Sequence, residues 1–161
     1  MKNEPHRTAI TRKTLSAPMR WLNERGLIPM GGDKHKRLDY GCGKGFDADQ
    51  LGMMKFDPHF FPETCTGFNW YDIITCNYVL NVLPTVNERL DVLSSIVWGL
   101  NGNGVAYVSV RNDKRSLNGW TAKGTWQGFV EDDELETQGF RRIHEEANFR
   151  MFKYDKRNKA K

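Results

Sequence analysis

The sequence predicts an α/β protein with a doubly wound, mostly parallel sheet that ends in an antiparallel strand pair. Three observations support this fold class: a β-rich run enters a glycine-rich turn, later β-rich runs alternate with helical patterns, and two β-rich runs lie close together near the C-terminus. The chain has 161 residues, enough for one domain with a hydrophobic core. We therefore expect residues 1–161 to form a single domain.

The N-terminal half is expected to contain a helix followed by a βαβ unit. The helix begins at Thr14 or Ser16 and ends near Arg25, where Gly26 stops it. The βαβ unit then runs in the order strand 37–40, glycine turn 41–45, helix to about residue 51 and strand 53–57.

The C-terminal half continues the alternation of strands and helices. Residues 71–76 predict a buried strand, residues 86–100 a helix capped by Thr85, and residues 104–111 a second buried strand. A short helix over 131–137 precedes two strands, 140–145 and 149–154, joined by a tight turn at 147–148. This last pair predicts the antiparallel end of the sheet.

Composition points to a cytoplasmic protein without a membrane-spanning segment. Hydrophobic residues make up 39% and charged residues 27% of the chain, and residues 1–12 lack the apolar core of a secretory signal. The three cysteines lack the CxxC pairing of a zinc site, and the four histidines are scattered. We therefore expect reduced thiols and no metal site.

Charge is distributed unevenly along the chain. Residues 1–37 carry nine Lys or Arg against three Asp or Glu, and residues 141–161 carry eight against three, so the middle of the chain is acidic. We expect a basic N-terminal helical segment over 1–36 and a basic tail over 153–161. Basic ends suit a nucleic acid partner, although basic ends that only aid solubility are an equal alternative. The sequence leaves the oligomeric state open.

The glycine turn carries most of the functional information. Its pattern is Asp39-x-Gly41-x-Gly43-x-Gly45, whereas a dinucleotide-binding turn of the form GxGxxG would need Gly or Ala where Phe46 stands. A carboxylate just before the turn repels a pyrophosphate but attracts the amino group or the sulfonium of S-adenosylmethionine (SAM). The pattern therefore favours SAM over a nicotinamide dinucleotide.

A second acid stands at the end of the next predicted strand. Asp57 follows Asp39 by 18 residues, at a position where an acid can accept hydrogen bonds from both hydroxyls of a ribose. The two carboxylates together predict one adenosyl-binding site. The alternative is a tight strand-to-helix connection that binds no ligand.

These two stretches resemble motifs of a known family. Residues 38–45 resemble motif I of the class I SAM-dependent methyltransferases, and residues 55–58 resemble their acidic motif after the second strand. A wider set of short matches, over residues 7–10, 15–18, 39–45, 56–58 and 76–82, resembles proteins assigned as methyltransferases beside DNA phosphorothioation systems. The resemblance covers about two thirds of the chain and implies the Rossmann-like, three-layer fold of class I methyltransferases.

The resemblance also implies roles for individual residues. Asp39 would face the methionine amino group of SAM, Asp57 would hold the ribose, and residues just after it, such as His59, would flank the adenine. Only 14 residues separate Asp57 from Asp72, scarcely room for the third strand of this fold and its helix. The residues expected to bind SAM are Asp39, Gly41, Cys42, Gly43, Gly45, Asp57, Pro58 and Asn77.

The acceptor is expected beyond the carboxyl ends of the strands. Tyr78 follows one strand, and the loop 112–129 combines Trp120 and Trp126 with Lys114, Arg115 and Lys123, a mixture that can stack bases and hold phosphates. The alternative is that both tryptophans cover the edge of a small hydrophobic core and do not contact an acceptor. Cys76 stands where base C5 methyltransferases place a nucleophile, although a thiol that ends a buried strand more often packs in the core.

Together these observations predict a SAM-dependent methyltransferase with a nucleic acid or nucleotide acceptor, while a small-molecule acceptor remains open. An enzyme that degrades SAM, and a noncatalytic module that binds nucleic acid or protein, are the alternatives. No general base or other catalytic residue stands out in the sequence.

Overall fold

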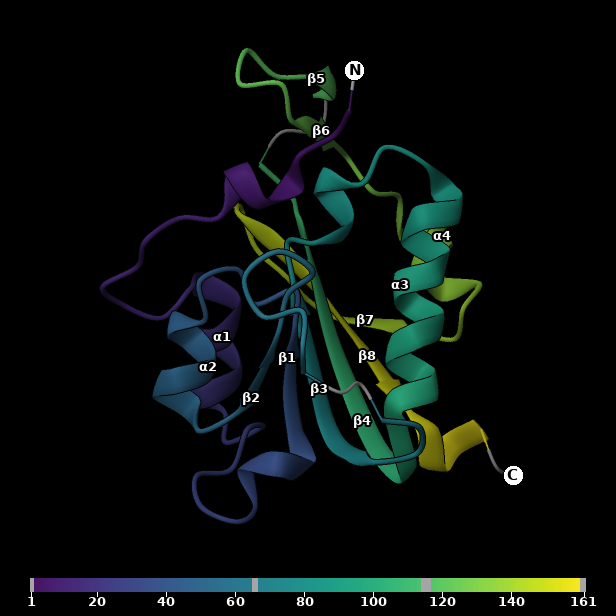
Figure 1. Cartoon of the computed structure of the whole chain (residues 1–161). Helices are drawn as coiled ribbons and strands as arrows, with labels where there is room; N and C mark the ends of the chain where they lie inside the picture. Colours follow the sequence, from purple (N-terminus) through teal and green to yellow (C-terminus); the bar gives the residue numbers. More distant parts are fainter. Residues whose placement is uncertain (1, 65–66, 114–116, 160–161) are drawn as a thin grey trace.

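Six strands form one twisted sheet with helices on both faces (Figure 1). The computed structural model describes residues 2–64, 67–113 and 117–159. The strand order is β2-β1-β3-β4-β8-β7, in which β1 to β4 run parallel and β8 runs antiparallel to both of its neighbours. These strands are β1 (Arg37–Tyr40), β2 (Met54–Phe56), β3 (Tyr71–Asn77), β4 (Leu100–Arg111), β7 (Arg141–Glu145) and β8 (Phe149–Asp155). The predicted mostly parallel sheet with an antiparallel end is confirmed.

Within the described residues, four α-helices connect these strands or precede them. They are α1 (Ala17–Glu24), α2 (Phe46–Leu51), α3 (Val86–Gly99) and α4 (Asp132–Glu136). The Ser16 hydroxyl caps α1 by accepting the backbone N–H of Met19, and Thr85 caps α3 in a reciprocal pair with Glu88. Both helices therefore begin where the sequence predicted.

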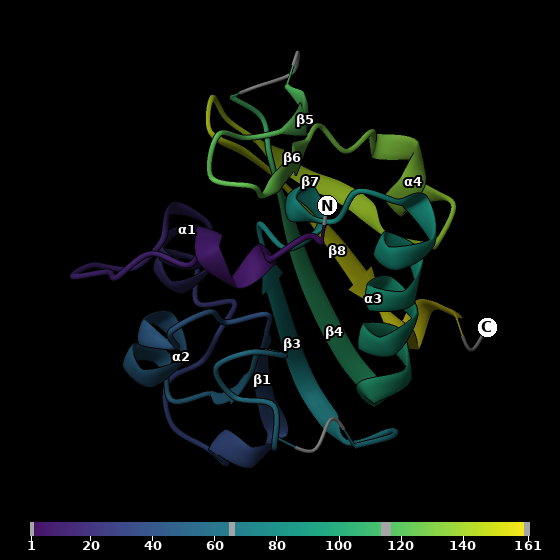
Figure 2. The same ribbon diagram turned by 45° about the horizontal axis from the view of Figure 1, so that its top comes forward.

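Two hydrophobic cores separate the molecule into three layers. Helices α1 and α2 pack on one face of the sheet, where Met19 and Leu51 meet Phe149 and Met151. Helices α3 and α4 cover the other face, with a core that includes Ile74, Leu93, Ile96, Val108, Leu135 and Phe152. Figure 2 shows the two helix pairs on opposite sides of β3 and β4. The sandwich expected from the sequence is present.

The region after the second strand is as short as its sequence predicts. Within residues 57–64 and 67–70, the chain forms one isolated β-bridge, between Asp57 and Phe61, and these described residues contain no further strand or helix. Strand β2 therefore lies at the edge of the sheet.

One predicted strand boundary was wrong. Strand β4 begins at Leu100 instead of residue 104, because α3 leads into it without a loop and Leu100 already pairs with Tyr71. Within the N-terminal 36 residues, η1 (Pro5–Thr8) and η2 (Lys34–Lys36) are single 3-10 turns that lie before and after α1. At the C-terminal end, η4 (Lys156–Lys159) follows β8.

A small hairpin was not predicted. Strands β5 (Asn118–Trp120) and β6 (Trp126–Gly128) form a separate antiparallel pair within the loop expected to carry the acceptor. Three-residue strands without an alternating pattern leave little trace in a sequence.

Among the described residues, no helix combines the length and apolarity that crossing a bilayer requires.

Candidate functional site

The glycine turn between β1 and α2 depends on a backbone shape that glycine favours. Gly41, Gly43 and Gly45 have φ angles of +73°, +56° and +83°. The backbone N–H groups of Gly41 and Cys42 donate to the Phe56 carbonyl at 2.7 and 3.0 Å, which joins the turn to the end of β2. A Cβ atom on Gly41 would lie 2.3 Å from Cγ2 of Val79, so Val79 also leaves no room for a side chain at position 41.

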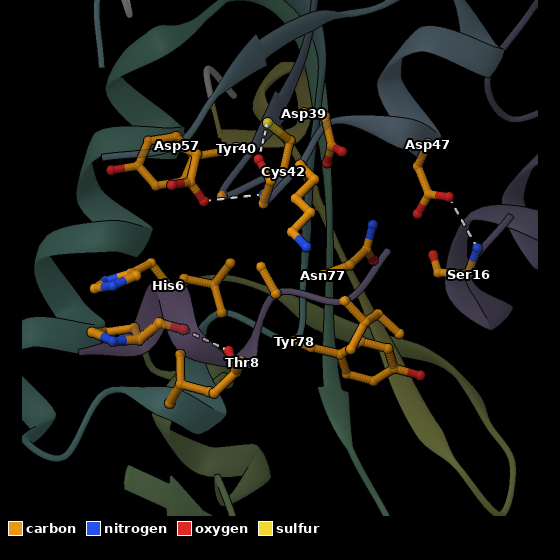
Figure 3. A pocket seen from close by; sticks show the side chains of 18 of the residues that line it. His6, Thr8, Ser16, Asp39, Tyr40, Cys42, Asp47, Asp57, Asn77 and Tyr78 are labelled. Carbon is orange, nitrogen blue, oxygen red and sulfur yellow. Dashed lines mark hydrogen bonds between the residues drawn. The ribbon is translucent and has the colours of Figure 1, made fainter. Parts of the chain in front are cut away.

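A cavity of about 950 Å³ opens beside this turn, at the carboxyl ends of the parallel strands (Figure 3). All eight residues expected to bind SAM line it, together with Tyr78, whereas Trp120 and Trp126 do not. The structure thus brings together the residues that the resemblance assigns to SAM. They are Asp39, Gly41, Cys42, Gly43, Gly45, Asp57, Pro58 and Asn77.

Asp39 is a buried carboxyl at the floor of the cavity, 4% exposed. The Thr75 hydroxyl donates to its Oδ1 at 2.8 Å. Burial raises the pKa of Asp39 to about 7; the nearby carboxylates of Asp47 and Asp57 add to this rise, while Thr75 and the Arg12 guanidinium oppose it. Near neutral pH this carboxyl is therefore partly ionised, and a cation in the cavity would favour the charged form.

Asp57 organises the other side of the turn. Its Oδ2 accepts the backbone N–H of Gly43 at 3.0 Å, and its Oδ1 accepts those of His59 and Phe60 at 2.9 and 3.1 Å. The side chain therefore holds both the glycine turn and the start of the connection that leaves β2. A carboxylate has about four acceptor positions, so one more donor, such as a ribose hydroxyl, can still be accommodated.

Asn77 and Tyr78 end β3 at the cavity. The Ser109 hydroxyl donates to Oδ1 of Asn77 at 2.7 Å. The buried Nδ2 of Asn77 has no hydrogen-bond partner in the part of the chain described. Tyr78 has a φ of +61°, a rare conformation for a bulky residue. Burial raises the pKa of Tyr78 to about 12, so its hydroxyl stays protonated and serves as a hydrogen-bond donor near neutral pH.

The two described cysteines differ in position. Cys42 lines the cavity, whereas Cys76 is fully buried in the core beneath α3 and does not line it. Burial raises the pKa of both thiols, and the negative charge of Asp39 adds to the effect. A protonated thiol inside the core is not placed for nucleophilic attack, so Cys76 has a packing role. Cys65 lies outside the described residues.

The N-terminal segment contributes a wall that sequence reasoning missed. Seven of its residues line the cavity: Lys2, Pro5, His6, Thr8, Ala9, Ile10 and Arg12. Asn3 fixes the segment, because its Nδ2 donates to the Val82 carbonyl at 2.8 Å and its Oδ1 accepts the backbone N–H of Trp126 at 3.1 Å. No periodic pattern in a short polar segment tells where it docks. The resemblance over residues 7–10 was the available signal.

The tryptophan hairpin adjoins the cavity without entering it. Trp120 is 43% exposed and packs edge to face on Trp126, with ring centroids 5.8 Å apart. The neighbouring Gln127 lines the cavity, and Asn81 donates to the Gly128 carbonyl at 2.7 Å. Lys114 and Arg115 lie outside the described residues. Within those described, no three His, Cys, Asp or Glu side chains gather as a metal site would require.

Comparison with known proteins gives structural matches only. No protein-family model matches the sequence, and no curated protein matches it. A SAM-dependent methyltransferase from Mesorhizobium loti superposes with a TM-score of 0.54 at 12% identity, over 85% of this chain and 97% of that one.

Two further matches hold S-adenosylhomocysteine (SAH). NodS, an N-methyltransferase from Bradyrhizobium japonicum, matches with a TM-score of 0.57 at 11% identity, over 85% of this chain and 84% of that one. The 1,6-didemethyltoxoflavin-N1-methyltransferase from Burkholderia thailandensis, which also holds 1,6-didemethyltoxoflavin, matches with a TM-score of 0.55 at 13% identity, over 90% and 92%.

Likenesses at such low identity concern the fold alone. None of these matches bears on DNA phosphorothioation systems, so that association stays a prediction. The chain has the Rossmann-like fold of the class I SAM-dependent methyltransferases.

Proposed function

We propose that the protein binds SAM in the cavity beside the glycine turn and transfers its methyl group to an acceptor. One observation carries the proposal: the same cavity of about 950 Å³ is lined by Asp39, by the glycine turn and by Asp57. The fold supports it, because NodS and the toxoflavin methyltransferase hold SAH within the same architecture.

The lining residues fit SAM chemically. A buried carboxyl with a pKa of about 7 gains from a positive ligand group, which SAM offers as its amino group and sulfonium. Asp57 has acceptor capacity left for a ribose hydroxyl. The Nδ2 of Asn77, which has no partner among the described residues, can donate to a ligand oxygen. Cys42 and Pro58 complete the walls.

Little further chemical machinery is needed, because SAM supplies an activated methyl group when bound. The chain's task is to hold the acceptor atom in line and exclude competing water. Tyr78 and Asn77 stand at the end of β3, where an acceptor would lie. Each offers a hydrogen-bond donor to orient it.

We further propose a nucleic acid or nucleotide as acceptor. The cations Lys2, Arg12 and Lys44 line the cavity, and the hairpin beside it exposes the ring of Trp120. Phosphate groups suit the former and an unstacked base suits the latter. A small heterocycle is the second candidate, because a matched enzyme of this fold holds 1,6-didemethyltoxoflavin.

The test is transfer of a labelled methyl group from SAM to DNA, RNA, nucleotides and a small-molecule cell fraction. We expect label in one of the nucleic acid or nucleotide samples, and much less label at the same SAM concentration when Asp39→Asn replaces the wild type. Label in the small-molecule fraction alone would favour the heterocycle. Loss of SAM without any acceptor would identify a SAM-degrading enzyme instead.

A matched pair of tryptophan variants tests the hairpin. Trp120→Ala should weaken binding of a single-stranded oligonucleotide by about 5-fold or more, since a base stack is worth about 1–3 kcal/mol. Trp98→Ala is the control, because Trp98 is 53% exposed on α3 and does not line the cavity. Equal binding by the two variants would remove the hairpin from the acceptor site.

A further inference from the structure

A nucleoside held at Asp57 requires a wall for its base, and the connection from β2 to β3 offers little material for one. Its described residues form no strand or helix. Near Asp57 this connection supplies His59 and Phe60, whose rings meet edge to face with centroids 4.7 Å apart. Any larger wall must come from another part of the chain.

The N-terminal segment reaches this place. The ring of His6, from η1, stacks on the ring of His59 with centroids 3.8 Å apart and planes 10° from parallel. The backbone N–H of His59 in turn donates to Asp57 at 2.9 Å. Both histidines line the cavity, and Figure 3 shows His6 on the same side of it as Asp57. An aromatic pair therefore lies beside the position expected for the ribose.

The segment is anchored on both sides of His6. Asn3 bonds to Val82 and Trp126, and Thr11 accepts a hydrogen bond from Nζ of Lys44 at 2.9 Å. Ala9 lies against the glycine turn, since a Cβ on Gly43 would be 3.2 Å from the Cβ of Ala9. These contacts hold the segment that carries His6 against the cavity. The apolar side chains lining the same cavity include Val79, Val82, Leu83 and Val92.

We propose, on the basis of the proposed function, that the N-terminal segment is the base-binding wall of the cofactor site. His6, supported from behind by its stack with His59, presents an aromatic face to the adenine of SAM. Aromatic faces hold purine rings by stacking. The segment thus replaces the wall that the short connection after β2 does not build.

Calorimetric titration with two ligands tests this assignment. SAH carries base, ribose and amino acid, whereas 5′-methylthioadenosine carries base and ribose only. His6→Ala should lower the affinity for both ligands by a similar factor, about 5- to 150-fold, as loss of one stack predicts. His6→Phe, which keeps an aromatic plane, should restore most of the affinity. Asp39→Asn should weaken SAH and leave 5′-methylthioadenosine unchanged.

Arg7→Ala is the matched control on the same 3-10 turn. Arg7 is exposed, pairs with Glu4 at 3.2 Å and does not line the cavity, so its loss should leave both affinities unchanged. Thermal unfolding of each variant checks that the fold is kept.

The outcomes separate the two proposals. If wild-type protein binds neither ligand, the proposed function fails. If the wild type binds SAH and His6→Ala binds it equally well, the SAM site stands and the base-binding wall is refuted. A His6→Ala variant that weakens SAH but not 5′-methylthioadenosine would also refute the wall, because the effect would then lie at the amino acid end.

Discussion

The backbone N–H of Gly43 donates to the carboxylate of Asp57 at 3.0 Å, so the acid after the second strand holds the turn that follows the first. The same carboxylate accepts the N–H groups of His59 and Phe60. In the free protein Asp57 is thus a structural side chain, and in the proposed function it also meets the ribose.

Asp57→Ala should therefore destabilise the free protein. Three backbone donors would lose their acceptor, and a buried unpaired donor costs about 1–3 kcal/mol. Asp49→Ala is the control, since the Asp49 side chain is 57% exposed and pairs with Lys55 at the surface. Urea unfolding without ligand should show a clear loss of unfolding free energy for Asp57→Ala and little loss for Asp49→Ala. Equal stability of the two would mean that Asp57 does not hold the turn.

Asp39→Asn should stabilise the free protein at alkaline pH. The unfolded carboxyl ionises near pH 3.9, whereas burial moves the folded pKa to about 7. The folded state therefore holds an extra proton between these values, and stability is lost as pH rises from about 4 to about 7, at about 1.4 kcal/mol per unit. The amide oxygen that replaces the carboxylate can still accept the Thr75 hydroxyl.

The measurement is unfolding of wild type and Asp39→Asn at pH 5 and pH 8. The stability of the variant relative to wild type should be greater at pH 8, by up to a few kcal/mol at about 1.4 kcal/mol per pKa unit. A difference that does not change with pH would show that Asp39 ionises normally.

Gly41→Ala should cost more than strain alone. Gly41 and Gly26 share a positive φ, +73° and +64°, but a Cβ on Gly41 would meet Val79 while a Cβ on Gly26 meets nothing within 4 Å. Gly26→Ala should cost about 1–2 kcal/mol from the left-handed backbone. Gly41→Ala should exceed it and also weaken SAH binding. Similar losses in thermal unfolding would show that Val79 moves aside easily.

Cys76→Ala should retain methyl transfer per folded molecule. Its thiol is buried in the core and does not line the cavity, so the change removes packing and no chemistry. A stability loss of about 1 kcal/mol is expected. Activity is measured against the best acceptor from the transfer assay and corrected for the folded fraction. Abolished transfer by a folded variant would restore Cys76 as a nucleophile.

The βαβ unit was predictable because its signals are local. Glycines at 41, 43 and 45 follow a β-rich run, and the structure gives each of them a positive φ. The helix caps at Ser16 and Thr85 are also local, since each hydroxyl binds a backbone N–H three residues later.

The rest depends on contacts between distant parts of the chain. Nothing within residues 2–12 shows that His6 stacks on His59 or that Asn3 binds Trp126. The short spacing between Asp57 and Asp72 showed that this connection lacks room for a strand and helix. It did not show that the N-terminal segment lies beside the cavity at this place. The burial that raises the pKa of Asp39 is likewise a tertiary property, set by the strands on either side of β1.

The most direct test is calorimetric titration of SAM into wild type and Asp39→Asn between pH 5.5 and 8. We predict saturable one-to-one binding by the wild type that strengthens as Asp39 ionises, by about tenfold per pH unit below 7, and weaker binding by the variant with little dependence on pH. Absence of saturable binding at about 1 mM SAM, or equal binding by the two proteins at pH 8, would contradict the proposed site.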